Sequence, residues 1–154
     1  MKPKPGAPDR QHPSYRLRGN GNFLVDLGMG DPRAPEAGFC EVIFPEFWLD
    51  EDAEVQPPPQ GALAPPRNPY LILRRAATGA LDLYHWWQQA REGKAPKRRI
   101  VTIELLAEDG VTVVMRWRFH EVRPVGLAYS PLQAQEPGLL FEKLTLAFGR
   151  VEMG

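Results

Sequence analysis

The side chains of this chain that could do chemistry do not fall into a pattern that catalysis or metal binding requires. His12, His85 and His120 are far apart and form no HExxH-type metal motif. Cys40 is the only cysteine, which excludes an internal disulfide and a cysteine-based zinc site. It alternates with apolar neighbours, so we expect a small core residue. The residues therefore predict no catalytic residue, no cofactor and no metal.

A short basic run, Lys94, Lys97, Arg98 and Arg99, has two interpretations. It could contact phosphate or a partner, or it could be a solvated loop between a helix and a strand. No aromatic ladder accompanies the run, so stacking on single-stranded nucleic acid is not indicated. The 19 basic and 19 acidic residues balance, and nothing global suggests attraction to nucleic acid or membranes.

Aromatic side chains are the candidates for contacts between subunits. Trp86 and Trp87 are adjacent, so on a helix they point about 100° apart. One can pack against a sheet, while the other stays at the rim, where it often anchors an interface in a homo-oligomer. Phe47 and Trp48 are also adjacent aromatic residues, and they lie beside an acidic segment, so one of them could likewise stay at the rim and anchor an interface. The candidate contact residues are therefore Phe47, Trp48, Asp50, Glu51, Asp52, Trp87, Lys97, Arg98 and Arg99.

Charge is segregated along the chain although its total is zero. Residues 19–66 hold one basic and nine acidic residues, net −8, and residues 67–126 hold eleven basic and six acidic, net +5. This could be chance patterning on a solvated surface. Alternatively, the acidic edge of one subunit meets the basic edge of another, which would set register and orientation.

The prolines divide the chain into segments. Of the 17 prolines, four lie in the first 13 residues and seven lie between 45 and 69. We therefore expect an extended arm over 1–14 and a Pro-rich acidic loop over 50–69. The length fits one domain, here 15–154. No apolar run is long enough for a transmembrane helix, and the N-terminus lacks a signal-peptide stretch.

The remaining segments alternate with period two, which predicts antiparallel strands with one wet face. We expect a helix over 78–93, with Thr78 as its cap, and a tight hairpin turn at Asp109-Gly110. The predicted strands cover 22–27, 39–44, 70–73, 100–106, 111–120 and 139–150.

This order of elements resembles the inner-tube protein family of contractile phage tails and contractile injection systems. The resemblance covers about residues 20–48 and 68–152. The segments that carry it are Asn22–Val25, Gly38–Val42, Tyr70–Ala76, Leu81–Trp86, Arg98-Arg99, Val101–Ile103, an acidic-Gly hairpin, Trp117, the x-Pro-Val turn Arg123-Pro124-Val125, and the closing strand Phe141–Ala147.

The resemblance implies a mainly β fold, a small antiparallel β-barrel or two-sheet sandwich with one flanking helix, as in the Hcp tube of type VI secretion. It implies a non-catalytic subunit that forms a homo-hexamer. Rings stack inside a sheath and meet baseplate or spike proteins, and DNA or toxin passes through the lumen. Assembly would take place in the bacterial cytoplasm, and the subunit would become part of a phage tail or an injection particle that can be released.

One segment departs from this family. Tube subunits carry a Gly-Gly-containing hairpin arm after the second strand, where this chain has Phe44–Trp48 and then the Pro-rich loop. Proline cannot donate to a ladder, so a regular hairpin is not expected. The contact between rings must therefore differ, which fits either a specialised initiator or adaptor ring at the baseplate or a repeating tube ring.

A stand-alone β-barrel that binds a small apolar ligand is the alternative function. The inward positions argue against it because they carry side chains large enough to fill a small barrel: Phe23, Met115, Trp117, Phe119 and Phe148.

Overall fold

The computed structural model describes residues 22–30, 32–33, 38–49, 67–94, 99–135 and 138–154. They form β1 (Phe23–Asp26), β2 (Glu41–Ile43), β3 (Leu71–Ala76), α1 (Asp82–Arg91), β4 (Arg99–Leu106), β5 (Val113–Tyr129), β6 (Phe141–Ala147) and β7 (Arg150–Met153). The predicted mainly β fold with one helix is confirmed. The arm expected at 1–14 and residues 50–66 of the expected loop lie outside the described residues. Within the described ranges, α1 does not have the length and hydrophobicity that a membrane-spanning helix needs.

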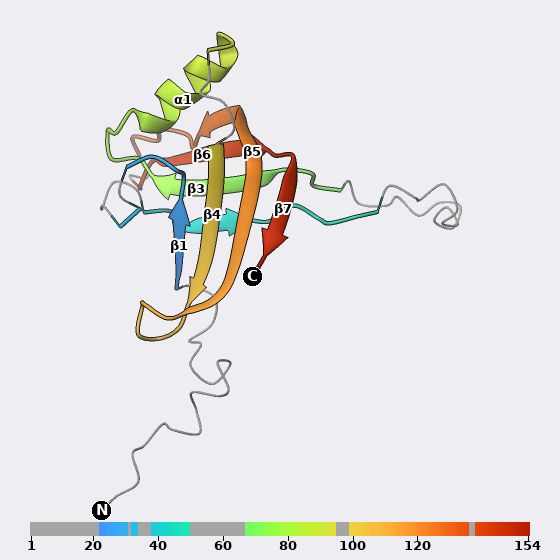
Figure 1. Ribbon diagram of the computed structural model, residues 1–154. Helices are drawn as coiled ribbons and strands as arrows, with labels where there is room; N and C mark the ends of the chain where they lie inside the picture. The colour runs from blue at the N-terminus through green and yellow to red at the C-terminus, as the bar shows by residue number, and fades with distance from the viewer. Residues whose placement is uncertain (1–21, 31, 34–37, 50–66, 95–98, 136–137) are drawn as a thin grey trace, which may run out of the picture.

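The strands form one antiparallel path, β1-β4-β5-β6-β3-β2, with β7 added to β5. The path folds over at β5 into two layers that cross each other (Figure 1). One layer holds β1, β4, β7 and the first part of β5, and the other holds β2, β3, β6 and the rest of β5. Among the described residues, β1 and β2 at the ends of the path do not pair. The two-sheet sandwich is therefore confirmed, and the barrel is not closed.

Strand β5 runs through both layers because the alternation of its inward-facing and outward-facing residues shifts by one residue at Glu121. This residue has a left-handed backbone, φ 56°, and the pairing with β4 and β6 is irregular on either side of it. Phe119 is buried before the bend and Pro124 after it, so the inward positions switch from odd to even. The sequence predicted a strand ending at His120 and a turn around Pro124. The strand instead continues to Tyr129, and Pro124 is tolerated at a register shift.

The strand predicted over 139–150 is two strands, β6 and β7, separated at Phe148-Gly149. The amide of Gly149 donates to the carbonyl of His120 at 2.8 Å. A Cβ at Gly149 would lie 2.7 Å from the Glu121 carboxylate. The chain therefore changes layer where it passes the bend in β5, and glycine leaves room for that close approach.

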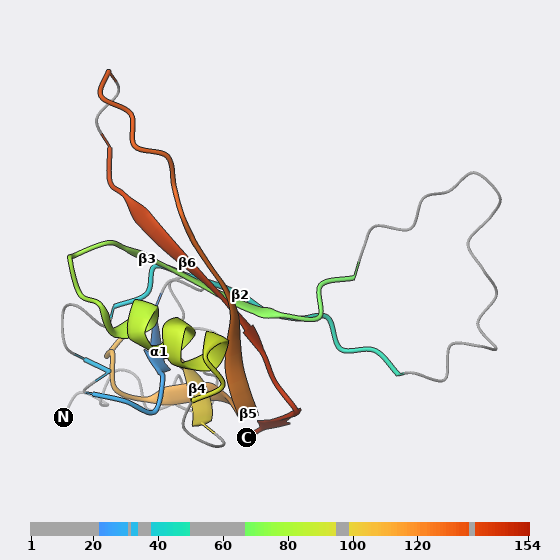
Figure 2. The same ribbon diagram turned by 90° about the horizontal axis from the view of Figure 1, so that it is seen from above.

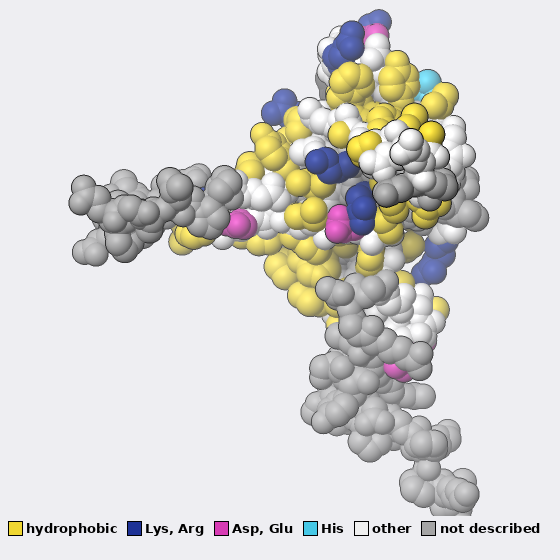
Figure 3. All heavy atoms as spheres, turned by 180° about the vertical axis from the view of Figure 1, so that it is seen from behind, with side chains coloured by type: hydrophobic (Ala, Val, Ile, Leu, Met, Phe, Trp, Pro, Cys, Tyr) yellow, Lys and Arg dark blue, Asp and Glu magenta, His cyan; other side chains and the backbone are white. Residues whose placement is uncertain are grey.

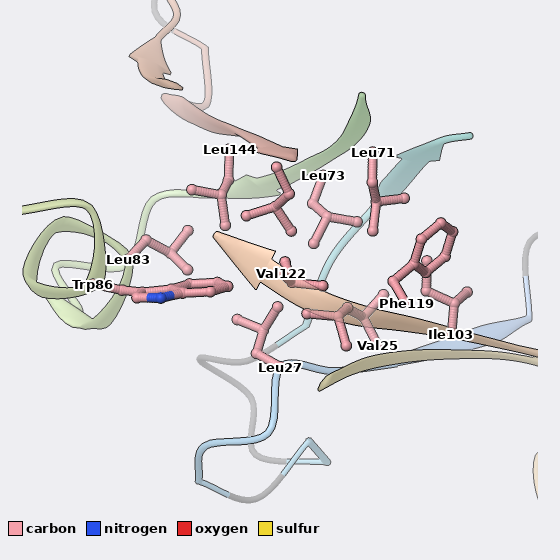
Figure 4. Close-up of a cluster of buried hydrophobic side chains, with 12 residues drawn as sticks. Val25, Leu27, Leu71, Leu73, Leu83, Trp86, Ile103, Phe119, Val122 and Leu144 are labelled. Carbon is pink, nitrogen blue, oxygen red and sulfur yellow. The ribbon is translucent and has the colours of Figure 1, made fainter. Parts of the chain in front are cut away.

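The core lies between the layers, and its side chains come from both (Figure 4). Leu83 and Trp86 of α1 cover one end of it. The rings of Phe119 and Phe148 meet edge-on, with centroids 5.0 Å apart. The buried hydrophobic cluster comprises Val25, Leu27, Leu71, Leu73, Leu83, Trp86, Val101, Ile103, Phe119, Val122, Leu144 and Leu146.

Helix α1 begins at Asp82, three residues later than the predicted cap at Thr78 would place it. Leu81 occupies the N-cap position and makes no side-chain capping bond. The Asp82 carboxylate is instead held by Arg75 of β3, which fixes the first turn against the sheet. The helix ends as predicted, with a left-handed glycine at Gly93, φ 71°.

Candidate intersubunit interface

Strand edges provide the first surface on which another copy could bind. In the described part of the chain, β1 pairs only with β4, β2 only with β3 and β7 only with β5. Each of these strands therefore has one unpaired edge. Such edges associate with other chains unless they are covered or blocked.

The second surface is the β2–β3 extension, which we define as residues 44–49 and 67–70. It projects away from the sandwich (Figure 2). Asn68 fastens its base because the side-chain amide donates to the carbonyls of Phe44 and Tyr70 at 3.2 and 2.9 Å. The amide of Glu46 donates to the Asn68 carbonyl at 2.8 Å. The two chain segments thus run together at the base, although the prolines predicted no regular hairpin in this region.

The β2–β3 extension presents unusually apolar side chains to solvent. Phe47, Trp48 and Leu49 are 54%, 55% and 76% exposed. The Arg67 guanidinium lies 3.8 Å from the Trp48 ring centroid, and the indole N–H of Trp48 donates to Glu46 at 2.8 Å. Trp48 is therefore held in place while its ring stays accessible, which is the state expected of an interface anchor.

A second projection, the β5–β6 extension, comprises residues 130–135 and 138–140 (Figure 2). The hydroxyl of Ser130 accepts from the amide of Phe141 at 2.8 Å, and the amide of Ser130 donates to the Phe141 carbonyl at 3.0 Å. Leu132 and Leu139 are 85% and 72% exposed. The candidate residues did not include this extension. The sequence feature that could have indicated this extension is a pair of leucines in a stretch rich in proline and glycine.

Trp87 lies in α1, and Arg99 is the first residue of β4. Helix α1 lies away from the β2–β3 extension (Figure 1). Trp86 is buried and Trp87 is half-buried, as the prediction of one packed and one rim tryptophan requires. The Arg99 guanidinium stacks 4.1 Å from the Trp86 ring centroid, and burial lowers the pKa of Arg99. Part of the surface of the Arg99 guanidinium is therefore covered by a contact within the chain.

The candidate residues therefore fall in two places. Phe47 and Trp48 lie on the β2–β3 extension, Trp87 on the helix and Arg99 at the start of β4. Asp50, Glu51, Asp52, Lys97 and Arg98 lie outside the described residues. Their role in subunit contacts stays a prediction.

The acidic segment 19–66 and the basic segment 67–126 meet within one chain at an ion pair. Glu41 lies opposite Arg74 in the β2–β3 ladder, and their side chains are 3.1 Å apart. Glu104 and Arg116, which both belong to the basic segment, face each other across β4 and β5 at 2.6 Å. Pairing between neighbouring strands therefore uses some of these charges within the chain.

An ion triad, whose members Arg75 and Glu142 are buried, joins α1 to the sheet. Arg75 is 1% exposed and Glu142 is 5% exposed, and the Arg75 Nε donates to Glu142 at 2.8 Å. The same guanidinium binds Asp82 through both terminal nitrogens. Burial alone would lower the pKa of Arg75, but the hydrogen bonds and charges of Asp82 and Glu142 raise it. For Asp82, burial would raise the pKa, and Arg75 lowers it.

Cys40 is exposed, so its prediction as a core residue is wrong. It lies just before β2, where its amide donates to the Arg74 carbonyl at 2.8 Å, and its sulfur is 3.4 Å from the same oxygen. His85 is exposed, and His120 lies 3.0 Å from Glu152. No group of three or more potential metal ligands occurs among the residues that the structure describes.

The resemblance implied a two-layer antiparallel sandwich with one flanking helix, and the structure has this architecture. Residues 65–152 match the T4-like virus tail tube protein gp19 family, and the chain belongs to that family. The match covers β3, α1, β4, β5 and β6 and ends in β7. Among curated proteins, no significant match was found.

Solved structures share the fold at low sequence identity. A chain of the PVC sheath/tube terminator in the extended state, from an extracellular contractile injection system, is 21% identical with a TM-score of 0.65, covering 86% of this chain and 93% of that one. A chain of the anti-feeding prophage baseplate is 19% identical with a TM-score of 0.59, covering 90% and 95%. Hcp1 from Flavobacterium johnsoniae is 12% identical with a TM-score of 0.51, covering 86% and 94%.

Proposed function

We propose that this chain is a non-catalytic subunit of hexameric rings in the inner tube of a contractile injection system or phage tail. The observation that carries the proposal is the set of unpaired edges on β1, β2 and β7 in a member of the tail tube family. A cyclic ring covers such edges with a finite number of copies. The exposed apolar side chains of the two extensions supply further contact surface.

A specialised initiator or adaptor ring at the baseplate end is a second candidate. Its support is the β2–β3 extension, where the Pro-rich segment replaces the arm that ordinary tube subunits carry. Structures that share the fold come from a sheath/tube terminator and a baseplate, as well as from Hcp1. The proposal therefore extends to rings at either end of a tube as well as to repeating rings.

The partners that we propose are neighbouring tube rings, sheath subunits and baseplate or spike proteins. DNA or a toxin passes through the lumen as cargo. The subunit is assembled in the bacterial cytoplasm and becomes part of the tail or the injection particle.

Electron microscopy of the purified chain at high protein concentration tests this function. We expect rings with six-fold symmetry. A chain that stays monomeric at every concentration and binds neither sheath nor baseplate proteins would contradict the proposal.

Deletion of residues 50–66 tests the contact between rings. We expect the domain to fold and single rings to form, while stacking is lost. A variant with a Gly/Ser segment of equal length in place of residues 50–66 is the matched control. It keeps the length of the segment and removes its acidic and proline side chains. A deletion variant that fails to fold would show that this segment belongs to the core.

A further inference from the structure

Helix α1 and the β4–β5 tip, which we define as residues 107–112, lie at opposite ends of the molecule (Figure 1). Both lie on the side of the molecule away from the β2–β3 extension (Figure 2). Two surfaces at opposite ends of one domain can meet only between different copies. A head-to-tail contact of this kind can repeat along an axis without closing on itself.

Helix α1 has an apolar stripe on its outer side as well as the one that faces the core. Leu83 and Trp86 are the buried side. On the outer side, Leu81 is 58% exposed and Tyr84 is 42% exposed. Trp87 is half-buried, and its ring centroid lies 6.4 Å from that of Tyr84. A helix that is apolar on both sides is normally covered on both, so the outer stripe has the character of a contact surface.

Cations lie at the C-terminal end of this outer stripe. Arg91 is exposed, and its guanidinium lies 5.6 Å from the Trp87 ring centroid. Lys94 is also exposed and lies 3.9 Å from the Glu92 carboxylate. Two cations and one carboxylate give this end a net charge of +1. Figure 3 shows Lys and Arg side chains at the end of the molecule where α1 ends, with hydrophobic side chains next to them.

The β4–β5 tip presents a surface of complementary character. Glu108 and Asp109 are exposed, and Val111 is 70% exposed. Arg33 donates to the carbonyl of Gly110 at 3.5 Å, so one cation lies beside the tip. Two carboxylates and one cation give a net charge of −1. The tip therefore combines an exposed apolar side chain with negative charge.

Hydrogen bonds within the tip fix its shape. The Asp109 carboxylate accepts from the amides of Val111 and Thr112 at 2.8 Å each. The amide of Gly110, a residue with a left-handed φ of 69°, donates to the Ala107 carbonyl at 2.9 Å. A surface that is already ordered loses little conformational freedom on binding. The tip is thus preorganised for a contact.

We propose that the β4–β5 tip of one copy binds the outer stripe of α1 on a second copy, in the next ring of a stack. Val111 covers Tyr84, and the Glu108 carboxylate faces Arg91. The opposite charges of the two surfaces favour a second copy as the occupant and set the polarity of the contact. The inner stripe of α1 still completes the core of its own chain. Only the placement in successive rings rests on the proposed function.

Disulfide cross-linking between two variants tests the contact. In a Cys40→Ser background, one variant carries Tyr84→Cys and the other carries Val111→Cys. At high protein concentration and under mild oxidation, we expect the mixture to form the mixed dimer at least tenfold faster than a control mixture. The control replaces Val111→Cys with Lys143→Cys, which puts an exposed cysteine on β6. Equal rates in the two mixtures would overturn the proposal.

Reversal of the two charges tests which side chains face each other. Arg91→Glu in the Tyr84→Cys variant, or Glu108→Arg in the Val111→Cys variant, should slow the cross-linking at least fivefold. The mixture with both reversals should recover most of the rate. A mixture with both reversals that is as slow as either single one would overturn the proposed pairing. Unfolding midpoints of all variants check that the reversals leave the fold intact.

Electron micrographs of the same mixtures separate this inference from the proposed function. Six-fold rings that stack without the mixed dimer would overturn the contact and leave the proposed function intact. The mixed dimer in a sample without rings would support the contact and contradict the proposed function. A sample with neither would contradict both.

Discussion

The two ends of the sandwich use the same kinds of side chain in opposite ways. At the end covered by α1, Trp86 is 2% exposed and stacks with Arg99 at 4.1 Å. On the β2–β3 extension, Trp48 is 55% exposed and stacks with Arg67 at 3.8 Å. The two tryptophan–arginine pairs have similar geometry and different surroundings.

The difference shows which part of the molecule is completed by its own chain. Around α1, every member of the ion triad has a partner, and Leu83 and Trp86 fill the space above the sheets. On the two extensions, large apolar side chains such as Leu49 and Leu132 remain in solvent. Exposed apolar surface of this kind marks contacts with other molecules. The helix end therefore stabilises the subunit, and the extensions are available for assembly.

Truncation of the two tryptophans gives the largest contrast. Trp86→Ala should lower the free energy of unfolding by about 3–5 kcal/mol, because it opens a cavity under α1. Trp48→Ala should change it by no more than about 0.5 kcal/mol, since the side chain is exposed. Urea denaturation of the two variants measures both values. Equal losses would show that the β2–β3 extension is part of the folding core.

The ion triad gives the next contrast. Arg75→Met leaves the Glu142 carboxylate buried without its partner, and should cost about 3–5 kcal/mol of stability. Arg116→Met, which removes a partly exposed partner of Glu104, should cost about 1 kcal/mol or less. The double variant Arg75→Met with Glu142→Leu should recover much of the loss. A double variant as unstable as Arg75→Met alone would contradict the triad explanation.

Substitutions on the extensions should separate assembly from folding. Trp48→Ser and Leu132→Ser should leave the unfolding midpoint nearly unchanged and reduce the fraction of subunits in rings or stacks. Light scattering coupled to size-exclusion chromatography measures that fraction. Trp48→Phe, which keeps an aromatic ring, is the control for Trp48→Ser. If both serine variants assemble like the parent chain, the extensions do not carry the contacts.

Strands were predictable from the sequence where the alternation is uninterrupted. Val101 and Ile103 are buried as the period-two pattern of β4 predicts. Leu105, predicted to share their face, is only half-buried, whereas Leu106 is buried, because the pairing with β5 shifts between these residues. The bend at Glu121 likewise had no local signal, since a left-handed conformation is unusual for glutamate.

The candidate interface was predictable only in part, for a related reason. Adjacent tryptophans on a helix must diverge, so a packed Trp86 and a rim Trp87 followed from helix geometry. The partners of buried charges did not follow, because Arg75 and Glu142 are 67 residues apart in sequence and meet only through the β3–β6 pairing. The β5–β6 extension was missed because its leucines lie in an irregular segment without periodicity.

The smallest expected effect concerns acid stability at the helix end. Arg75 lowers the pKa of Asp82 in the folded chain, so this carboxyl group binds its proton more weakly there than in the unfolded chain. Its stabilising contribution is present above the unfolded pKa of about 3.9 and is lost as the pH falls through the lower folded value. The difference in unfolding free energy between the parent chain and Asp82→Asn should therefore shrink below about pH 4. Urea denaturation of both chains between pH 7 and pH 3 measures it, with Asp26→Asn, whose carboxylate accepts a local bond from the Gly28 amide, as the control. A difference that stays constant across this range would show that Asp82 acts on α1 without its charge, and the helix end would then depend on the Arg75–Glu142 pair alone.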